Sequence, residues 1–402
     1  MLVAAGATEH AHTILSLTAI MAAALLSPLL SYVTGKRIPA VVIMLALGVV
    51  IGPEMLGLAE LGTGIEVLRE LGLGMLFLLA GFEINVRTLT GKQGRNAIAT
   101  WFACLLIAFL AAALVLDSAF LTAATLAIAV TSTALGTLMP ILKSTESLPE
   151  DIKEGVMIHG AVGELLPIMA IAIVLSTRST WVTLVVIALF FFIALLVAFV
   201  PRTVAAIVPW ISRAFIDGAS ATNQTVVRMV ILLLLILMSV AAVFQLDVVL
   251  GAFAAGIILR TLVPKDSRPH VEKRLDVVGY GFLIPIFFIC SGMAISVKDV
   301  AQAPWGVLVV VGVILVARGM PIFLHELFRD TGSGIKDARE KLQLGLYSAT
   351  GLPIIVAVTE VATKAELLSQ QRASILVAGG AATVLIFPLL AAALQPKSER
   401  SL

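Results

Sequence analysis

Two stretches of this sequence combine hydroxyl side chains with residues that break helices, and both lie inside apolar segments. An interrupted helix exposes main-chain polar groups, which a membrane tolerates only where other protein or a water-filled cavity satisfies them. Hydroxyl and carbonyl oxygens at such breaks are the ligands that a hard alkali cation prefers. The alternative is a pair of ordinary kinks, in which Ser and Thr bond back to the carbonyls of their own helix. The residues are Thr131, Ser132, Thr133, Gly136 and Pro140 in the first stretch and Ser348, Thr350, Gly351 and Pro353 in the second.

Two charged residues, Glu164 and Arg318, interrupt apolar segments elsewhere in the chain. A carboxylate at mid-membrane costs at least about 2.5 kcal/mol on insertion scales, so it is a candidate for function. Counting about 1.5 Å per residue from the helix ends places both residues and the two broken stretches near one plane. We therefore predict a site in which a proton or a monovalent cation binds Glu164, with Thr131 to Thr133 as oxygen ligands and Arg318 as the charge partner. A purely structural buried ion pair is the alternative.

His159 lies five residues before Glu164 and faces partly elsewhere on a helix. We predict a role in packing or on an entry path rather than as a ligand, and it could tune proton access.

The elements that must position these residues are membrane spans. The chain has 402 residues, of which 60% are hydrophobic and only 13% charged, with a mean hydropathy of +1.08. Its apolar runs are about twenty residues long, which is the length that crosses a bilayer core. We predict an all-α polytopic membrane protein whose first run is a membrane helix rather than a secretory signal, since no basic residue precedes it. The thirteen predicted spans are 13–33, 39–57, 66–84, 96–116, 119–143, 155–176, 180–201, 226–246, 247–263, 278–296, 303–328, 340–363 and 370–394.

The sequence lacks the motifs that several other classes of function require. The two cysteines, Cys104 and Cys290, each lie in a hydrophobic run and indicate neither a disulfide framework nor a thiolate metal site. The sequence has no Gly-rich phosphate loop and no nucleophile triad. We therefore expect a transporter rather than an enzyme, with no cofactor and no nucleic-acid partner.

The basic residues give an independent check on the span assignment. With the N-terminus outside, about four fifths of the lysines and arginines fall in loops on the inner side, as the positive-inside rule requires. A miscounted helix would disturb this alternation. We expect a multi-pass protein of the bacterial inner membrane, with its N-terminus outside and its C-terminus cytoplasmic.

The spans also contain a weak internal repeat. The third span ends on a run from Phe77 to Arg87, and the tenth ends on a similar run from Phe288 to Lys298, 211 residues later. Weaker echoes pair 46–48 with 254–256 and 133–136 with 350–353. Each repeat falls seven helices later, so the second copy crosses the membrane in the opposite direction, which makes an inverted repeat. We predict a first repeat over 1–176, a linker helix and loop over 177–225, a second repeat over 226–394 and a short cytoplasmic tail over 395–402.

Five motifs together carry a resemblance to a known family. They are Leu47-Gly48 to Gly52-Pro53, Leu79-Ala-Gly-Phe-Glu83, Thr131-Ser-Thr-Ala134, Gly251-Ala-Phe-Ala-Ala-Gly256, and Pro285-Ile-Phe-Phe288 with Gly292-Met293. With these motifs the chain resembles the monovalent cation:proton antiporter superfamily, in the branch of glutathione-gated potassium efflux transporters and bacterial sodium/proton antiporters. The resemblance implies two crossing discontinuous helices, core and dimerisation bundles, a homodimer, and an acidic motif on the sixth span. Family members carry Asp there after Asp, Asn or Gln, whereas this sequence has Gly163 and Glu164.

The expected function is exchange of Na⁺ or K⁺ for protons by alternating access, serving pH homeostasis. One titrating acid suggests electroneutral, one-for-one exchange. Two alternatives remain: a sodium-coupled symporter in which Arg318 binds an organic anion, and a sensor or scaffold that has lost ion coupling.

Overall fold

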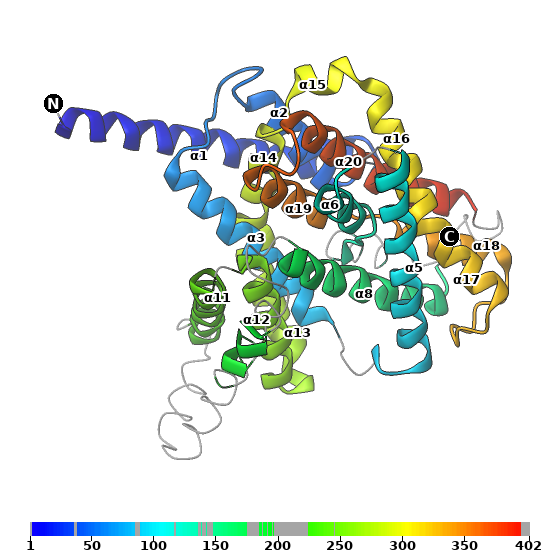
Figure 1. Cartoon of the computed structure of the whole chain (residues 1–402). Coiled ribbons are helices and arrows are strands. Elements are labelled where there is room, and N and C mark those ends of the chain that lie inside the picture. Colours follow the sequence, from blue (N-terminus) through cyan, green and yellow to red (C-terminus); the bar gives the residue numbers. More distant parts are fainter. Residues whose placement is uncertain are drawn as a thin grey trace, which may run out of the picture. The chain divides into compact units, whose positions relative to one another are not determined.

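The computed structural model describes residues 2–35, 38–84, 89–115, 118–135, 138, 142, 148–174, 185–186, 188–190, 192–194, 196, 224–244 and 246–394. In this part of the chain the only regular elements are helices (Figure 1). Contacts divide the chain into two units, one of residues 1–66, 85–175 and 288–402, the other of residues 67–84 and 176–287. All of the predicted site residues belong to the first unit.

The described residues form a succession of helices along the chain. Their bounds are α1 Leu2–Val33, α2 Ala40–Ile51, α3 Thr63–Glu83, α5 Lys92–Val115, α6 Phe120–Val130, α8 Glu150–Val174, α11 Thr225–Val243, α12 Val248–Leu262, η1 Lys265–Ser267, α13 Arg268–Val278, η2 Gly279–Leu283, α14 Ile284–Met293, α15 Val297–Gln302, α16 Pro304–Ile314, η3 Leu315–Gly319, α17 Met320–Phe328, α18 Ala338–Ser348, α19 Leu352–Lys364 and α20 Gln370–Ala393.

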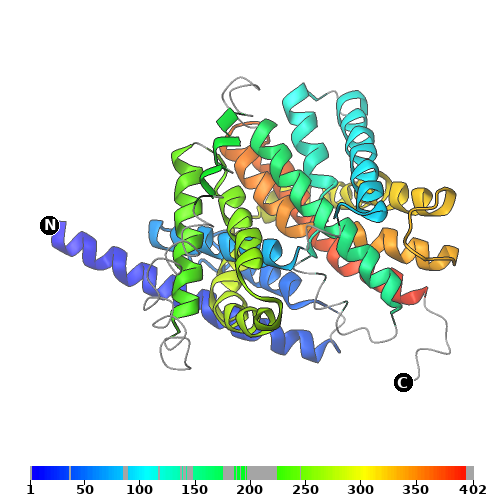
Figure 2. The same ribbon diagram turned by 90° about the horizontal axis from the view of Figure 1, so that it is seen from below.

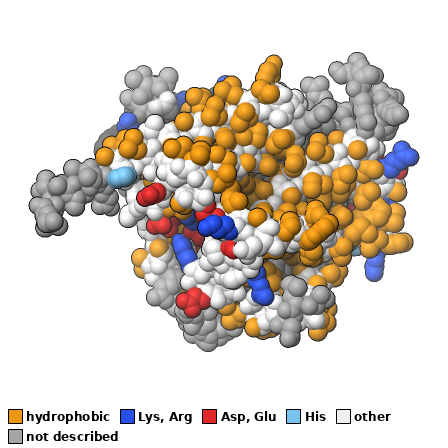
Figure 3. All heavy atoms as spheres, turned by 90° about the horizontal axis from the view of Figure 1, so that it is seen from above, with side chains coloured by type: hydrophobic (Ala, Val, Ile, Leu, Met, Phe, Trp, Pro, Cys, Tyr) orange, Lys and Arg blue, Asp and Glu red, His pale blue; other side chains and the backbone are white. Residues whose placement is uncertain are grey.

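Eight helical stretches in the described residues are long and apolar enough to cross a membrane, and α2, α6 and α12 are shorter apolar helices. Large hydrophobic side chains on the outer faces of helices such as α5, α11 and α16 are exposed. Figure 3 shows hydrophobic side chains over much of the face in view, with several charged side chains left of centre and a few more toward the edges. Such a surface suits contact with lipid rather than water. The helices and their apolar outer faces together confirm the predicted all-α polytopic fold.

Most predicted spans match a helix, but some ends differ. α1 begins well before residue 13, and α2 ends at Ile51 rather than 57 because Gly52 is followed by Pro53, which disfavours helix at the preceding residue. The tenth span starts earlier than 278, because α13, the π-helical turn η2 and α14 form one continuous stretch from Arg268. The predicted seventh span, the linker and the tail lie mostly outside the described residues.

Glycines allow two pairs of helices to touch along their main chains. A Cβ at Gly48 in α2 or at Gly292 in α14 would lie 2.1 Å from a main-chain oxygen of the other helix. In the second unit a Cβ at Gly256 in α12 would lie 2.1 Å from a main-chain oxygen of α3, and one at Gly81 in α3 would lie 2.4 Å from one of α12. Gly256 lies 208 residues after Gly48, and Gly292 lies 211 residues after Gly81. The two glycine contacts are therefore related by the same offsets as the predicted repeats. In the same unit α11 and α12 lie side by side in Figures 1 and 2.

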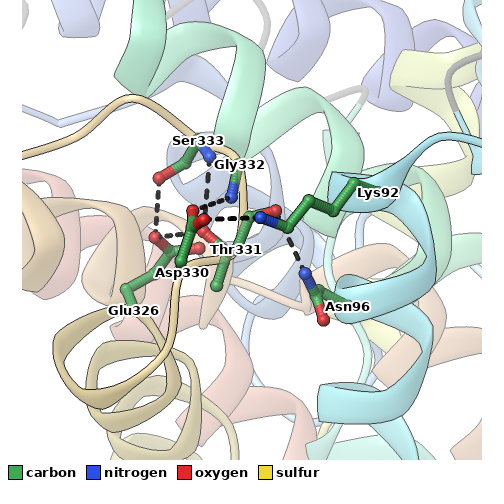
Figure 4. Close-up of polar contacts among 7 residues, drawn as sticks. All are labelled: Lys92, Asn96, Glu326, Asp330, Thr331, Gly332 and Ser333. Carbon is green, nitrogen blue, oxygen red and sulfur yellow. Dashed lines mark hydrogen bonds and ion pairs between the residues drawn. The ribbon is translucent and has the colours of Figure 1, made fainter.

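The loop between α17 and α18 is tied to the start of α5 (Figure 4). The ammonium of Lys92 lies 2.6 Å from Oδ2 of Asp330, and the amide of Asn96 donates to the carbonyl of Thr331 at 3.0 Å. Buried Glu326 of α17 accepts hydrogen bonds from the hydroxyls of Thr331 and Ser333, at 2.8 and 2.7 Å. These contacts fix the loop against α5.

The contacts of α5 continue toward the middle of the unit. Thr100 Oγ1 lies 2.5 Å from Nδ1 of His325, and Cys104 Sγ donates to the carbonyl oxygen of Arg318 at 3.9 Å. Lys92, Asn96, Thr100 and Cys104 are four residues apart and so lie on one helix face. This polar face of α5 therefore follows α17 and η3 up to Arg318.

Candidate functional site

The first break follows the end of α6 at Val130. The hydroxyl of Thr131 donates to the carbonyl of Ala127 at 2.7 Å, and that of Ser132 donates to the carbonyl of Ala129 at 2.7 Å. Carbonyls in the last turn of a helix have no partner within it. The hydroxyls reinforce two carbonyls that also accept from the main-chain amides of Thr131 and Ser132, at 3.1 and 3.4 Å, so the chain can leave the helix within an apolar unit. The predicted Gly136 and Pro140 lie outside the described residues.

The second break separates α18 from α19 at residues 349–351. Thr350 Oγ1 donates to the carbonyl of Tyr347 at 2.9 Å, and Pro353 lies in the first turn of α19, where a proline costs no hydrogen bond. Gly351 is required by close approach, because a Cβ there would lie 2.6 Å from the main-chain oxygen of Ser132. The two breaks therefore meet at this glycine.

Hydrogen bonds hold the two breaks against each other. The amide of Ala134 donates to the carbonyl of Thr350 at 2.7 Å, and the hydroxyl of Thr133 donates to the carbonyl of Ser348 at 2.6 Å. Ser132 Oγ, whose hydrogen points to Ala129, also lies 3.2 Å from the carbonyl oxygen of Gly351. The two interrupted helices thus cross where the sequence predicts their breaks.

Glu164 lies at this crossing. It is on α8, only 3% exposed, and its Oε1 accepts a hydrogen bond from the main-chain amide of Leu135 at 2.6 Å. The preceding residue, Gly163, accepts from the amide of Thr133 at 2.9 Å through its carbonyl. Hydrogen bonds to an ionised acceptor are about twice as strong as neutral ones. The carboxylate is therefore fixed against the first break.

Arg318 reaches the crossing from η3. It is fully buried, and its Nε and Nη2 both donate to the hydroxyl oxygen of Thr133, at 3.2 and 3.0 Å. Nη2 also donates to the carbonyl of His159 at 2.8 Å, while Nη1 has no hydrogen-bond partner in the described part of the structure. Arg318 lies in η3, a π-helical turn inside a long helix, and such turns are frequent at functional sites. Its described hydrogen bonds reach Thr133 and the main chain of α8 rather than the Glu164 carboxylate.

His159 is buried on α8, and its main-chain oxygen, rather than its ring, holds Arg318. The ring atom Nδ1 has no hydrogen-bond partner among the described residues. The hydroxyl of Ser348 is likewise buried without a described partner, although its carbonyl takes part in the crossing.

Sequence reasoning missed the contributions of Leu135 and Cys104 to the site, and it named Gly163 only as a departure from the family motif. The amide of Leu135 and the missing side chain of Gly163 act through packing between distant segments, which no local pattern reveals. Cys104, which donates to the main chain of Arg318, could have been found, because it continues the polar face that starts at Lys92 on α5.

Comparison with known proteins identifies the family of the chain. The family described as sodium/hydrogen exchanger, transmembrane, matches residues 20–394. The chain belongs to the sodium/hydrogen exchanger family. This is a family of membrane transporters and not of enzymes, and the resemblance inferred from the five motifs is confirmed.

Individual relatives within the exchanger family are distant. The chain is 22% identical over 278 residues to the Na⁺/H⁺-K⁺ antiporter GerN of Bacillus cereus, which covers 67% of this chain and 69% of GerN. It is 27% identical over 304 residues to cation/H⁺ antiporter 18 of Arabidopsis thaliana, covering 68% of this chain and 36% of that protein. The chain also spans about half (49%) of the length of a Bacillus subtilis relative with which it shares 25% identity.

The same fold occurs in a solved exchanger structure. The sodium proton antiporter MjNhaP1 from Methanocaldococcus jannaschii matches with a TM-score of 0.65 over 94% of this chain and 96% of that one, at 17% identity. The fold is therefore shared across almost the whole length of both chains.

Proposed function

We propose that this chain is a secondary transporter that exchanges a monovalent cation, Na⁺ or K⁺, for protons, and that the two ions compete for Glu164. The observation that carries the proposal is the buried Glu164 carboxylate, held by Leu135 at the crossing of two interrupted helices. Membership of the exchanger family and the names of its relatives favour the same activity.

The hydroxyls at the first break supply the other cation ligands. Thr131 and Ser132 use their hydrogens on carbonyls of α6, so their oxygen lone pairs are available to a cation. Alkali cations prefer such oxygen ligands. Thr133 already donates to Ser348 and accepts twice from Arg318. It therefore holds Arg318 in place, and the cation binds to Glu164, Thr131 and Ser132.

Alternating access then follows from charge. A bound proton or cation neutralises Glu164, whereas the empty carboxylate is costly to move through an apolar environment. One carboxylate that binds either one proton or one monovalent cation gives electroneutral, one-for-one exchange. His159, whose ring lies buried on the same helix, is the candidate for proton access.

The setting is a homodimer in the bacterial inner membrane, with the N-terminus outside and the C-terminus cytoplasmic. The distribution of basic loops supports the orientation. The homodimer rests on the family resemblance.

The test is cation-dependent dequenching of a pH-sensitive dye in proteoliposomes. Glu164→Gln should abolish cation-dependent proton flux, because a neutral amide cannot exchange a proton for a cation. Glu326→Gln is the matched control: Glu326 is equally buried, at 3% exposed, but bonds Thr331 and Ser333 away from the crossing. Undiminished flux in Glu164→Gln refutes the site.

The two alternatives predict different results for the unmodified chain. Sodium-dependent uptake of an organic anion that ignores a pH gradient would identify the symporter. Absence of any flux in a folded chain would identify the sensor or scaffold.

A further inference from the structure

Gly163, the residue before Glu164, has no room for a side chain. A Cβ at this position would lie 2.5 Å from Thr133 Oγ1 and 2.6 Å from Nη2 of Arg318. Both distances are far below ordinary van der Waals contact, so the guanidinium lies in the space that a side chain at 163 would use.

Several elements hold the guanidinium there. The hydroxyl of Thr133 at the first break accepts from Nε and Nη2, and the carbonyl of His159 on α8 accepts from Nη2. His159 precedes Gly163 by four residues, so this carbonyl belongs to the helical turn that ends at Gly163. Cys104 of α5 donates to the main-chain carbonyl of Arg318. The positive charge is therefore fixed next to Gly163, the residue before Glu164.

A fixed positive charge weakens the field of a carboxylate on any bound cation. The amide of Leu135 on Oε1 weakens it further. In addition, residue 163 offers no side-chain oxygen to replace the water that a cation must lose. The number and field strength of ligands are one basis on which sites distinguish K⁺ from Na⁺. A weak field with few ligands favours the cations that lose water at least cost, which are the larger alkali ions.

We propose that Gly163 is a specificity-determining position: it admits the guanidinium of Arg318, and the exchanger therefore selects K⁺ and Rb⁺ over Na⁺ and Li⁺. This inference rests on the proposed cation/proton exchange. Gly163 and Arg318 act by setting the field at Glu164 and not by binding the cation themselves.

The experiment compares KM for Li⁺, Na⁺, K⁺ and Rb⁺ in proteoliposomes containing the full chain. Gly163→Ala should push the guanidinium away. Moving a unit charge from about 4 to about 5 Å at an effective dielectric constant near 20 changes affinity by about fourfold. We expect KM to fall by about this factor and the KM ratio of Na⁺ to K⁺ to fall with it. Gly155→Ala on the same helix is the control, since its Cβ would meet Leu344 at 3.1 Å and does not contact Arg318.

A second variant covers the case in which Gly163→Ala does not fold. Arg318→Gln keeps a donor but removes the charge, and it should shift the Na⁺ to K⁺ ratio in the same direction. If Gly163 acts through Arg318, then Gly163→Ala should have little further effect in the Arg318→Gln background. A loss of packing alone would lower the amount of folded protein without changing the ratio between cations.

The outcomes separate the two proposals. No cation-dependent proton flux with any of the four ions overturns the exchange function itself. Exchange that prefers Na⁺ or Li⁺ in the unmodified chain, or a cation ratio unchanged in both variants, overturns the role of Gly163 and leaves exchange at Glu164 standing.

Discussion

Replacing Thr133 by valine should remove the group that holds Arg318. The hydroxyl donates one hydrogen bond, to Ser348, and accepts two from the guanidinium. A neutral hydrogen bond contributes about 1 kcal/mol and one to a charged group about 1.5–3 kcal/mol. Because the two guanidinium donors share one oxygen, we count them as one charged interaction and expect Thr133→Val to destabilise the protein by about 2.5–4 kcal/mol in total. Arg318 would retain only the carbonyl of His159 as a hydrogen-bond partner in the described structure.

Thr133→Ser is the control for this prediction. Valine has nearly the shape of threonine and leaves no cavity, whereas serine keeps the hydroxyl and loses one methyl group, worth about 1 kcal/mol. The measurement is equilibrium unfolding in mixed micelles, together with proton flux in liposomes. In an Arg318→Met background the cost of Thr133→Val should fall to about 1 kcal/mol, since only the bond to Ser348 is then lost. Equal stability of the valine and serine variants would refute the assignment of Thr133 as the residue that holds Arg318.

Three further predictions follow from other contacts. Gly256→Ala should destabilise the protein by about 1–3 kcal/mol, because its Cβ would meet a main-chain oxygen of α3. Gly281→Ala is the control: a Cβ there has nothing within 4 Å, so this variant should be neutral in the same unfolding assay. The hydrogen bond and charge of Lys92 lower the pKa of Asp330. The contribution of this contact to stability should therefore persist above about pH 4 and be lost as the pH falls further. If Asp330→Asn loses thermal stability in acid to the same extent as the unmodified chain, this prediction is contradicted. The amides of residues 133–135 should stay protected from hydrogen exchange both with and without a cation gradient. Hydrogen-exchange mass spectrometry measures this protection, and faster exchange at these amides during transport would exclude a rigid crossing.

The fold and the positions of the breaks could be predicted because their signals are local. Apolar runs of spanning length fix the helices, and hydroxyl residues next to Gly351 and Pro353 mark where a helix can open. Glu164 and Arg318 stood out because charge within an apolar segment is costly. The contributions of Gly136 and Pro140 stay predictions, since both lie outside the described residues.

The partners of these charged residues could not be predicted. They depend on main-chain groups brought together from distant segments, and every residue has such groups regardless of its type. The role of Arg318 as the charge partner of Glu164 stays a prediction, and its described hydrogen bonds, which the sequence did not predict, reach Thr133 and His159. Gly163 was noted only as a departure from the family motif, whereas the structure shows the guanidinium in the space that a side chain there would use.

Three consecutive amides determine how this site can move. Those of Thr133, Ala134 and Leu135 donate to the carbonyl of Gly163, the carbonyl of Thr350 and the carboxylate of Glu164. Sliding α8 past the crossing would break the first and third bonds together, and in an apolar interior each orphaned group costs about 1–3 kcal/mol. If the proposed alternating access operates, these bonds favour movement of α8 and both interrupted helices as one body, which keeps Arg318 and Glu164 in a fixed relation.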